Sequence, residues 1–127
     1  MPGKNVSQKL LIKDGYKVLL IDPPKGYLTA RRGEFPGAKI SESKKGEADL
    51  IQVVVASDAE LKKKVPGLKE RLKPKGLLWA TYPKGASKLK SDIHRDTIRE
   101  YAETIGLEAV SIVAVDEDWS ALRLKPV

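Results

Sequence analysis

The sequence predicts a doubly wound α/β fold, in which helices cover a mostly parallel sheet. Two observations favour it. Strand-like apolar runs alternate along the chain with helix-like segments, and the central runs are apolar on both faces. Residues 49–56, Asp-Leu-Ile-Gln-Val-Val-Val-Ala, show this most clearly, because a strand this apolar cannot turn either face to water. Such a strand belongs inside a sheet that is covered on both sides.

Length and composition narrow the class of protein. The 127 residues suit one domain, and we expect residues 1–127 to form a single domain. The chain has no cysteine, which excludes disulfides, thiolate metal sites and a cysteine nucleophile. No apolar run is long enough to cross a bilayer, and the first five residues lack the apolar core of a signal peptide. We therefore expect a cytoplasmic protein with no membrane partner.

The first half of the chain contains three expected strands. In order, we expect a short helix at 7–12, a strand at 16–22, a short helix at 26–32, a weak strand at 38–41 and the buried strand at 49–56. Gly15 follows the first helix at a C-cap-like position. The first strand stops at Pro23-Pro24, because proline cannot donate to a β-ladder and restricts the residue before it.

The second half opens with a helix signal. Ser57 and Glu60 have the spacing of a capping box, and an apolar stripe follows at Leu61, Val65, Leu68 and Leu72. Pro66 interrupts the stripe and predicts a kink or two short helices. Further along, we expect a turn at 73–76, a buried strand at 77–82, a helix at 92–105, and strands at 109–115 and 119–124 that form an antiparallel hairpin.

Residues 72–79, Leu-Lys-Pro-Lys-Gly-Leu-Leu-Trp, resemble the turn and strand found late in class I methyltransferases. The closing helix, strand, turn and strand also resemble the hairpin that ends that fold. This resemblance implies a three-layer, Rossmann-like, six-stranded sheet of order 2-1-3-4-6-5, with the last strand inserted antiparallel. It implies nothing about activity, since one fold hosts many functions.

A closer resemblance is to a small uncharacterised bacterial family of unknown function, whose members have chains of this size and a Rossmann-like body. The matching residues lie mostly in the C-terminal half: Trp79, Pro83-Lys84, Ser87, Asp92, Asp116 and Trp119-Ser120. The first strand with Pro24-Lys25-Gly26-Tyr27 is also similar. The resemblance covers most of the chain and implies no known activity. We interpret Asp116, Trp119 and Ser120 as structural members of the pattern.

The methyltransferase resemblance fails at the cofactor motif. S-adenosylmethionine requires a glycine-rich turn after the first strand, so that the backbone can approach the ligand. Here that turn is Asp22-Pro23-Pro24-Lys25-Gly26, in which prolines and a lysine replace the glycines. Asp22-Pro23-Pro24 is similar to the start of a motif of amino-methylating enzymes, but that motif has an aromatic residue where Lys25 stands. We therefore expect neither S-adenosylmethionine nor another cofactor.

Ligands of open α/β sheets bind beyond the carboxyl ends of the strands. The predicted loops that follow the strands at 16–22 and 77–82 carry lysines at this edge, and the second loop leads into a helix N-terminus, which attracts anions. We predict an anion site there, made by Lys25, Lys84, Ser87, Lys88 and Asp92. The alternative is a lysine-rich surface loop in which Asp92 is an ordinary helix cap.

No residue pattern indicates catalysis or metal binding. The acidic run at 116–118 is interpreted as a turn, since three consecutive carboxylates rarely converge on one ion. His94 is the only histidine, and no nucleophile motif accompanies it. The basic cluster between Lys62 and Lys75 holds no aromatic residue for base stacking and is interpreted as a solvated helix face.

Three functions remain open from the sequence. The first is a non-catalytic domain that binds an anionic small molecule or a protein partner on a degenerate methyltransferase-like fold. The second is a nucleotide- or cofactor-dependent enzyme that uses the strand-end cleft, and the third is a nucleic-acid-associated protein, for which the net charge of +7 is a weak signal. The proline-rich turn after the first strand favours the first of these functions, the non-catalytic binding domain. The chain is compatible with a monomer or with a homodimer that pairs through an uncovered strand after Trp119.

Overall fold

Six strands form one sheet in the computed structural model, which describes residues 10–13, 15–22, 39–41, 46–83, 93, 95–115 and 119–126. The strands are β1 (Lys17–Ile21), β2 (Lys39–Ser41), β3 (Ala48–Val54), β4 (Leu72–Pro83), β5 (Leu107–Ala114) and β6 (Trp119–Pro126). The helices are α3 (Asp58–Lys64), the 3-10 helix η1 (Leu68–Arg71) and α4 (Arg95–Thr104). The strand order is β2-β1-β3-β4-β6-β5, which confirms the predicted order.

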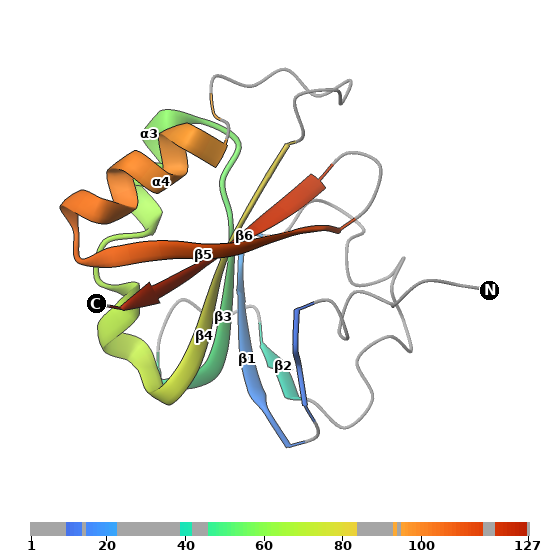
Figure 1. The fold of residues 1–127 in the computed structure, drawn as a ribbon. Coiled ribbons are helices and arrows are strands. Elements are labelled where there is room, and N and C mark those ends of the chain that lie inside the picture. The colour runs from blue at the N-terminus through green and yellow to red at the C-terminus, as the bar shows by residue number, and fades with distance from the viewer. Residues whose placement is uncertain are drawn as a thin grey trace.

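The sheet has a parallel part and an antiparallel part. β2, β1, β3 and β4 are parallel neighbours, whereas β6 lies antiparallel between β4 and β5. The parallel strands end at the upper edge of the sheet in Figure 1, and α3 and α4 lie against one face. The described part of the N-terminal segment, around residues 10–16, packs against the other face.

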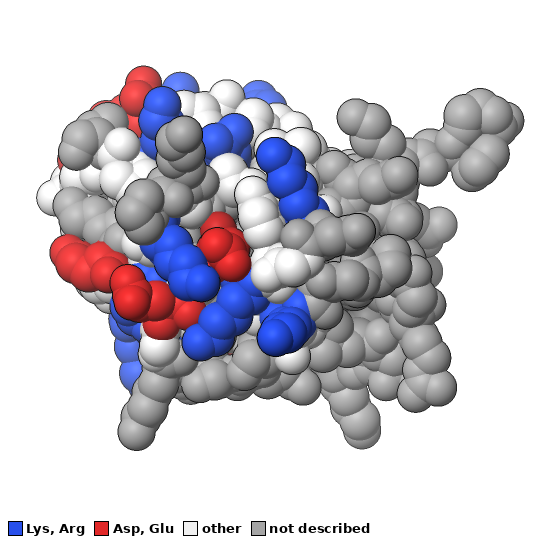
Figure 2. Space-filling view, turned by 90° about the horizontal axis from the view of Figure 1, so that it is seen from below, with Lys and Arg blue, Asp and Glu red and all other residues white. Residues whose placement is uncertain are grey.

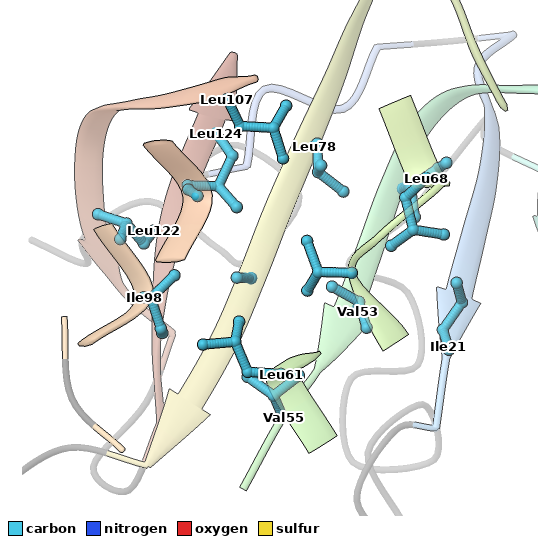
Figure 3. Packing of buried hydrophobic residues seen from close by; sticks show 14 of the residues in the cluster. Ile21, Val53, Val55, Leu61, Leu68, Leu78, Ile98, Leu107, Leu122 and Leu124 are labelled. Carbon is cyan, nitrogen blue, oxygen red and sulfur yellow. The ribbon is translucent and has the colours of Figure 1, made fainter. Parts of the chain in front are cut away.

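The larger core lies between the sheet and the helices. Leu61 of α3 and Ile98 of α4 are fully buried and point toward the strands (Figure 3). The break at Pro66 produces two short helices, α3 and η1, and Leu68 of η1 remains in the same core. The predicted apolar stripe therefore packs as expected, although no single helix carries it.

The strand β4 begins earlier than the sequence predicted. The register between β3 and β4 shifts between Ala48 and Leu50, so the predicted turn at 73–76 is a bulge inside the strand. Gly76 is required in this bulge, since a Cβ added to it would lie 2.8 Å from the backbone oxygen of Lys73. Turn-forming residues therefore mark an irregular strand here and not its boundary.

Two expectations at the ends of the chain are corrected. Of the helix predicted at 7–12, the structure describes residues 10–12, and Leu10 and Leu11 form a turn in which Leu11 has φ +63°, outside the helical region. The strand after Trp119 is β6, which is paired on both sides, so it is not the uncovered strand that a homodimer at this position would require, and the sheet ends with β5. The helix predicted at 26–32 lies outside the described residues.

Trp79 holds the N-terminal segment on the second face of the sheet. Its side chain is 1% exposed, and its Nε1–H donates a 3.0 Å hydrogen bond to the backbone oxygen of Leu10. Leu10 is itself fully buried in the same cluster as Val18 and Leu20 of β1. This hydrogen bond satisfies a polar atom that water does not reach.

We predict that Trp79→Phe weakens the attachment of the N-terminal segment. The substitution keeps an aromatic ring but leaves the Leu10 oxygen without its donor, which costs about 1–3 kcal/mol of unfolding free energy. Urea unfolding measures this loss, and limited proteolysis should cut residues 10–16 faster. Tyr82→Phe, on the opposite face, should leave that cleavage rate unchanged; equal cleavage in both variants would contradict the role of Trp79.

Candidate functional site

The carboxyl ends of β1, β3 and β4 meet at one edge of the sheet (Figure 1). From β1 the chain continues to β2 on one side, whereas from β3 it continues to β4 on the other. The switch in strand order therefore falls between β1 and β3. Open α/β sheets bind ligands at such a switch, which makes this edge the candidate site.

The five residues predicted to bind an anion, Lys25, Lys84, Ser87, Lys88 and Asp92, lie outside the described residues. The structure describes the elements that lead to them. β1 ends at Ile21 and is followed by Asp22, β4 ends at Pro83, and α4 begins at Arg95. The two lysine-bearing loops thus leave the sheet at the candidate edge, and the anion site itself stays a prediction.

Two of the three residues interpreted as structural, Trp119 and Ser120, begin the last strand. Trp119 and Ser120 lie opposite Pro83 and Tyr82 of β4, so β6 starts beside the candidate edge. The backbone N–H of Val115 donates a 2.9 Å hydrogen bond to the Trp119 oxygen, and the Trp119 side chain packs against the second core cluster. Asp116 lies outside the described residues.

Lys64 of α3 joins the ends of β1 and β3. Its Nζ lies 3.1 Å from Asp22 Oδ2, donates to the Val54 oxygen at 3.2 Å and to Glu60 Oε1 at 2.6 Å. The Lys64 side chain is only 16% exposed. Asp22 adopts φ +52°, a left-handed conformation that Asp tolerates better than most residues. An ammonium group with three oxygen partners therefore bridges the switch point.

The bridge holds its groups in their charged forms. Burial alone would lower the pKa of Lys64, but hydrogen bonds and charges from Glu60 and Asp22 outweigh it and raise this pKa. The hydrogen bond from Lys64 lowers the pKa of Glu60. Both groups remain ionised around neutral pH, and both pKa values move away from the neutral range in which general acid–base catalysis works best.

The predicted capping box places α3 against this edge. Ser57 is the N-cap, and its Oγ accepts a 3.1 Å hydrogen bond from the Glu60 backbone N–H. In return, Glu60 Oε2 accepts from the Ala56 N–H at 3.2 Å. The box is therefore confirmed, and the side chain that closes it is also the one that binds Lys64.

Two further groups lie near the ends of the strands. Burial raises the pKa of the Tyr82 hydroxyl, and the charge of Asp96 adds to this against the opposing charge of Arg95. Gln52 Nε2 donates a 2.9 Å hydrogen bond to Thr81 Oγ1 between β3 and β4, and both side chains are buried. The sequence analysis singled out neither Tyr82 nor the Gln52–Thr81 hydrogen bond. The contacts of both join segments that lie far apart in the sequence.

The sequence analysis also missed the bridge at Lys64. It placed this residue in the basic cluster between Lys62 and Lys75 and interpreted the cluster as a solvated face. That holds for Lys62, which is exposed and pairs with Asp58 at 2.9 Å. The four-residue spacing of Glu60 and Lys64 signals an ion pair within a helix, but no local pattern reveals the third partner, Asp22.

The opposite edge of the sheet, where the parallel strands begin, carries mixed charges. Figure 2 shows basic side chains lying among acidic ones when the molecule is seen from below. Lys73 Nζ lies 3.8 Å from Asp49 Oδ2, and Arg71 Nε donates to the Gly46 oxygen at 3.0 Å. Lys73 is therefore partly neutralised, whereas the backbone oxygen that Arg71 contacts carries no charge and leaves the guanidinium positive.

The described part of the chain offers no metal centre and no membrane span. No three His, Asp or Glu side chains come together there as possible ligands. Within the same residues, no helix is long and apolar enough to cross a membrane.

A family model described as "Protein of unknown function (DUF3052)" matches residues 37–127. The chain belongs to this family. The match confirms the resemblance to an uncharacterised family and includes α3, α4 and the β5–β6 hairpin. No curated protein matches the chain.

Solved methyltransferase structures share the fold of this DUF3052 protein. A SAM-dependent methyltransferase from Aquifex aeolicus gives a TM-score of 0.61 at 13% identity, over 96% of this chain and 88% of that one. The tRNA methyltransferase TrmK of B. subtilis gives 0.58 at 17%, over 100% and 67%. The ribosomal protein L11 methylase of Lactobacillus delbrueckii subsp. bulgaricus gives 0.58 at 11%, over 95% and 74%. At these identities the likeness shows the fold alone: methyltransferase-like α/β.

We predict that Lys64→Met destabilises the protein more than Lys63→Met. The first substitution leaves two carboxylates facing each other without their shared cation, whereas Lys63 is an exposed neighbour on the same helix. The expected cost is about 1–3 kcal/mol, toward the lower end because Asp22 and Glu60 are each 37% exposed. Urea unfolding measures both variants; equal effects would contradict the bridge.

We also predict a loss of stability in acid that depends on Glu60. Its pKa is lower in the folded protein than the usual 4.5, so its contribution is present above pH 4.5 and is lost as the pH falls through the folded pKa. Unfolding free energy measured against pH should therefore fall less steeply in Glu60→Gln. Glu100→Gln, at an exposed carboxylate of α4, is the matched control. An unchanged slope in Glu60→Gln would disprove this role.

Proposed function

We propose that this DUF3052 protein is a non-catalytic binding domain whose ligand is an anionic small molecule held at the carboxyl edge of the sheet. The observation that carries the proposal is the state of the titratable groups there. The pKa of Lys64 is raised, that of Glu60 is lowered and that of Tyr82 is raised. Each shift moves the pKa away from neutral pH, near which a group that exchanges protons during catalysis works best.

The same bridge argues against S-adenosylmethionine. In methyltransferase-like folds the space above the first strand has to admit the cofactor to the backbone. Here Lys64 ties Asp22 to the end of β3, and the sequence continues from Asp22 with two prolines and a lysine in place of glycines. We therefore propose that this protein does not take the cofactor.

The positive charge for an anion has to come from the loops. Lys64 is already neutralised by Asp22 and Glu60, and it offers little charge to a ligand. Lys25, Lys84 and Lys88 follow β1 and β4 in the sequence, and Ser87 and Asp92 precede α4. Lysines next to a helix N-terminus are a favourable environment for phosphate.

Thermal unfolding with separate ligands tests the proposal. The probes are ATP, pyrophosphate, an NAD-type dinucleotide and S-adenosylmethionine. A ligand at about 100 times its dissociation constant adds roughly 2.7 kcal/mol, which raises the midpoint by on the order of 5–15 °C in a domain of this size. We expect a phosphate-bearing probe to raise the midpoint in the wild type and in Lys62→Ala, but not in Lys84→Ala.

The other outcomes have defined meanings. A midpoint raised by S-adenosylmethionine would overturn the proposal in favour of a cofactor-dependent enzyme. No response to any probe would reject the anion and leave a protein partner as the ligand. A response that is equal in Lys84→Ala and Lys62→Ala would mean nonspecific binding to the basic surface, which weakens steeply with added salt.

A further inference from the structure

A groove lies between α4 and the β5–β6 hairpin, on the face of the sheet that carries the helices. Its volume is about 300 Å³. Ligand pockets in proteins usually measure about 300–1,000 Å³, so the groove has the size of a site for a small molecule. None of the described residues that line it belongs to the bridge around Lys64, and a ligand here does not depend on the one proposed for the carboxyl edge.

The floor of the groove is apolar. Ala109 and Ile112 of β5 and Leu122 of β6 contribute it. Ile112 and Leu122 lie opposite each other in the antiparallel pair. Leu122 is 6% exposed, whereas Ile112 is 43% exposed. An apolar group laid in the groove would remove the exposed part of Ile112 from water, which favours binding.

The side of the groove formed by α4 is charged. Arg95, Asp96 and Arg99 line it. Asp96 Oδ1 lies 3.5 Å from Arg99 Nη2, so this carboxylate is matched by one of the two guanidinium groups. The described lining therefore has an excess of one positive charge. A guanidinium group is a planar fork of donors, which fits a carboxylate or a phosphate in two parallel hydrogen bonds.

Arg95 stands at a position where a helix does not favour a cation. It is the first residue of α4, at the positive end of the helix dipole. Arg99 follows four residues later, and like charges at this spacing repel each other. The last turn of α4, where a basic residue would be favourable, contains none. Proteins break such local preferences mainly at functional sites, and an anion in the groove would offset both costs.

We propose that this groove binds a small organic anion, whose carboxylate or phosphate group pairs with Arg95 and whose apolar body lies on Ile112 and Leu122. Both parts of the ligand are required by the lining. A neutral apolar molecule would leave the charge of Arg95 unmatched, and an inorganic anion would leave Ile112 exposed to water.

Methyl NMR of the labelled full chain tests the proposal, because Ile112 and Leu122 report on the floor of the groove. The probes are hexanoate, hexyl phosphate, hexanol and pyrophosphate. We expect hexanoate or hexyl phosphate to move both methyl signals until the site is saturated, and the tighter of the two identifies the oxyanion. Hexanol should bind at least about tenfold more weakly, since it lacks the charge-assisted hydrogen bonds. Pyrophosphate, which has no apolar body, should leave both signals in place.

Matched variants assign the two parts of the ligand. Arg95→Gln should weaken binding of the tighter hexyl anion about tenfold. Arg123→Gln should bind as the wild type, because Arg123 alternates with the core residues Leu122 and Leu124 and so lies on the other face of the sheet.

The second pair of variants lies on β5. Ile112→Ser removes apolar surface from the floor and should weaken binding at least about fourfold, with Leu122 as the reporter. Val110→Ser is the control, because Val110 is 44% exposed on the same strand but does not line the groove. It should bind as the wild type.

Thermal unfolding without a ligand separates binding from structure. Arg95→Gln removes a cation from the start of a helix, so its midpoint should be no lower than that of the wild type. A clearly lower midpoint would show that Arg95 supports the fold and would overturn its assignment to a ligand.

Three binding results would also overturn the inference. The first is the absence of any movement of the two methyl signals with hexanoate and hexyl phosphate at millimolar concentration. The second is equal binding of hexanol and the hexyl anions, which would mean that no charge is recognised. The third is an equal loss of affinity in Arg95→Gln and Arg123→Gln, which would indicate nonspecific attraction to the basic surface.

Discussion

The structure depends on covering the central strands on both faces. Leu50 and Ile51 are neighbours in β3, point to opposite faces of the sheet and are both 0% exposed. Because both faces of the sheet are apolar here, each face needs its own covering layer. α3, η1 and α4 provide one layer, and the N-terminal segment held by Trp79 contributes to the other.

The need to cover the central strands determines where α3 starts. The position of α3 in turn determines which charged groups lie at the candidate edge. The helix has to turn back onto the sheet directly after β3, and the capping box at Ser57 and Glu60 allows this sharp return. One helical turn later, Lys64 lies over the end of β3 with the Val54 oxygen and Asp22 within reach. A packing requirement thus produces an ionic bridge at the position where related folds bind ligands.

The features that the sequence predicted are those with local causes. Sheet order follows from strands that are apolar on both faces together with the resemblance to methyltransferases, the capping box follows from two residues three apart, and the division of the helix follows from Pro66. The features that it missed depend on distant contacts. The burial of Lys64 needs Asp22, which lies more than forty residues earlier in the sequence. The early start of β4 needs β3 beside it, because residues 73–76 alone have the composition of a turn.

The range of the family match bears on what its members share. The matched residues begin at 37, after β1 and after the turn at 22–26 where a cofactor motif would stand. They include Lys64 and the whole of β5, but not Asp22. Any property that unites the family through this region therefore has to come from the covered strands, α3, α4 and the C-terminal hairpin. A binding function at the carboxyl edge draws on both parts of the chain, because Asp22 precedes the matched region and its partner Lys64 lies inside it.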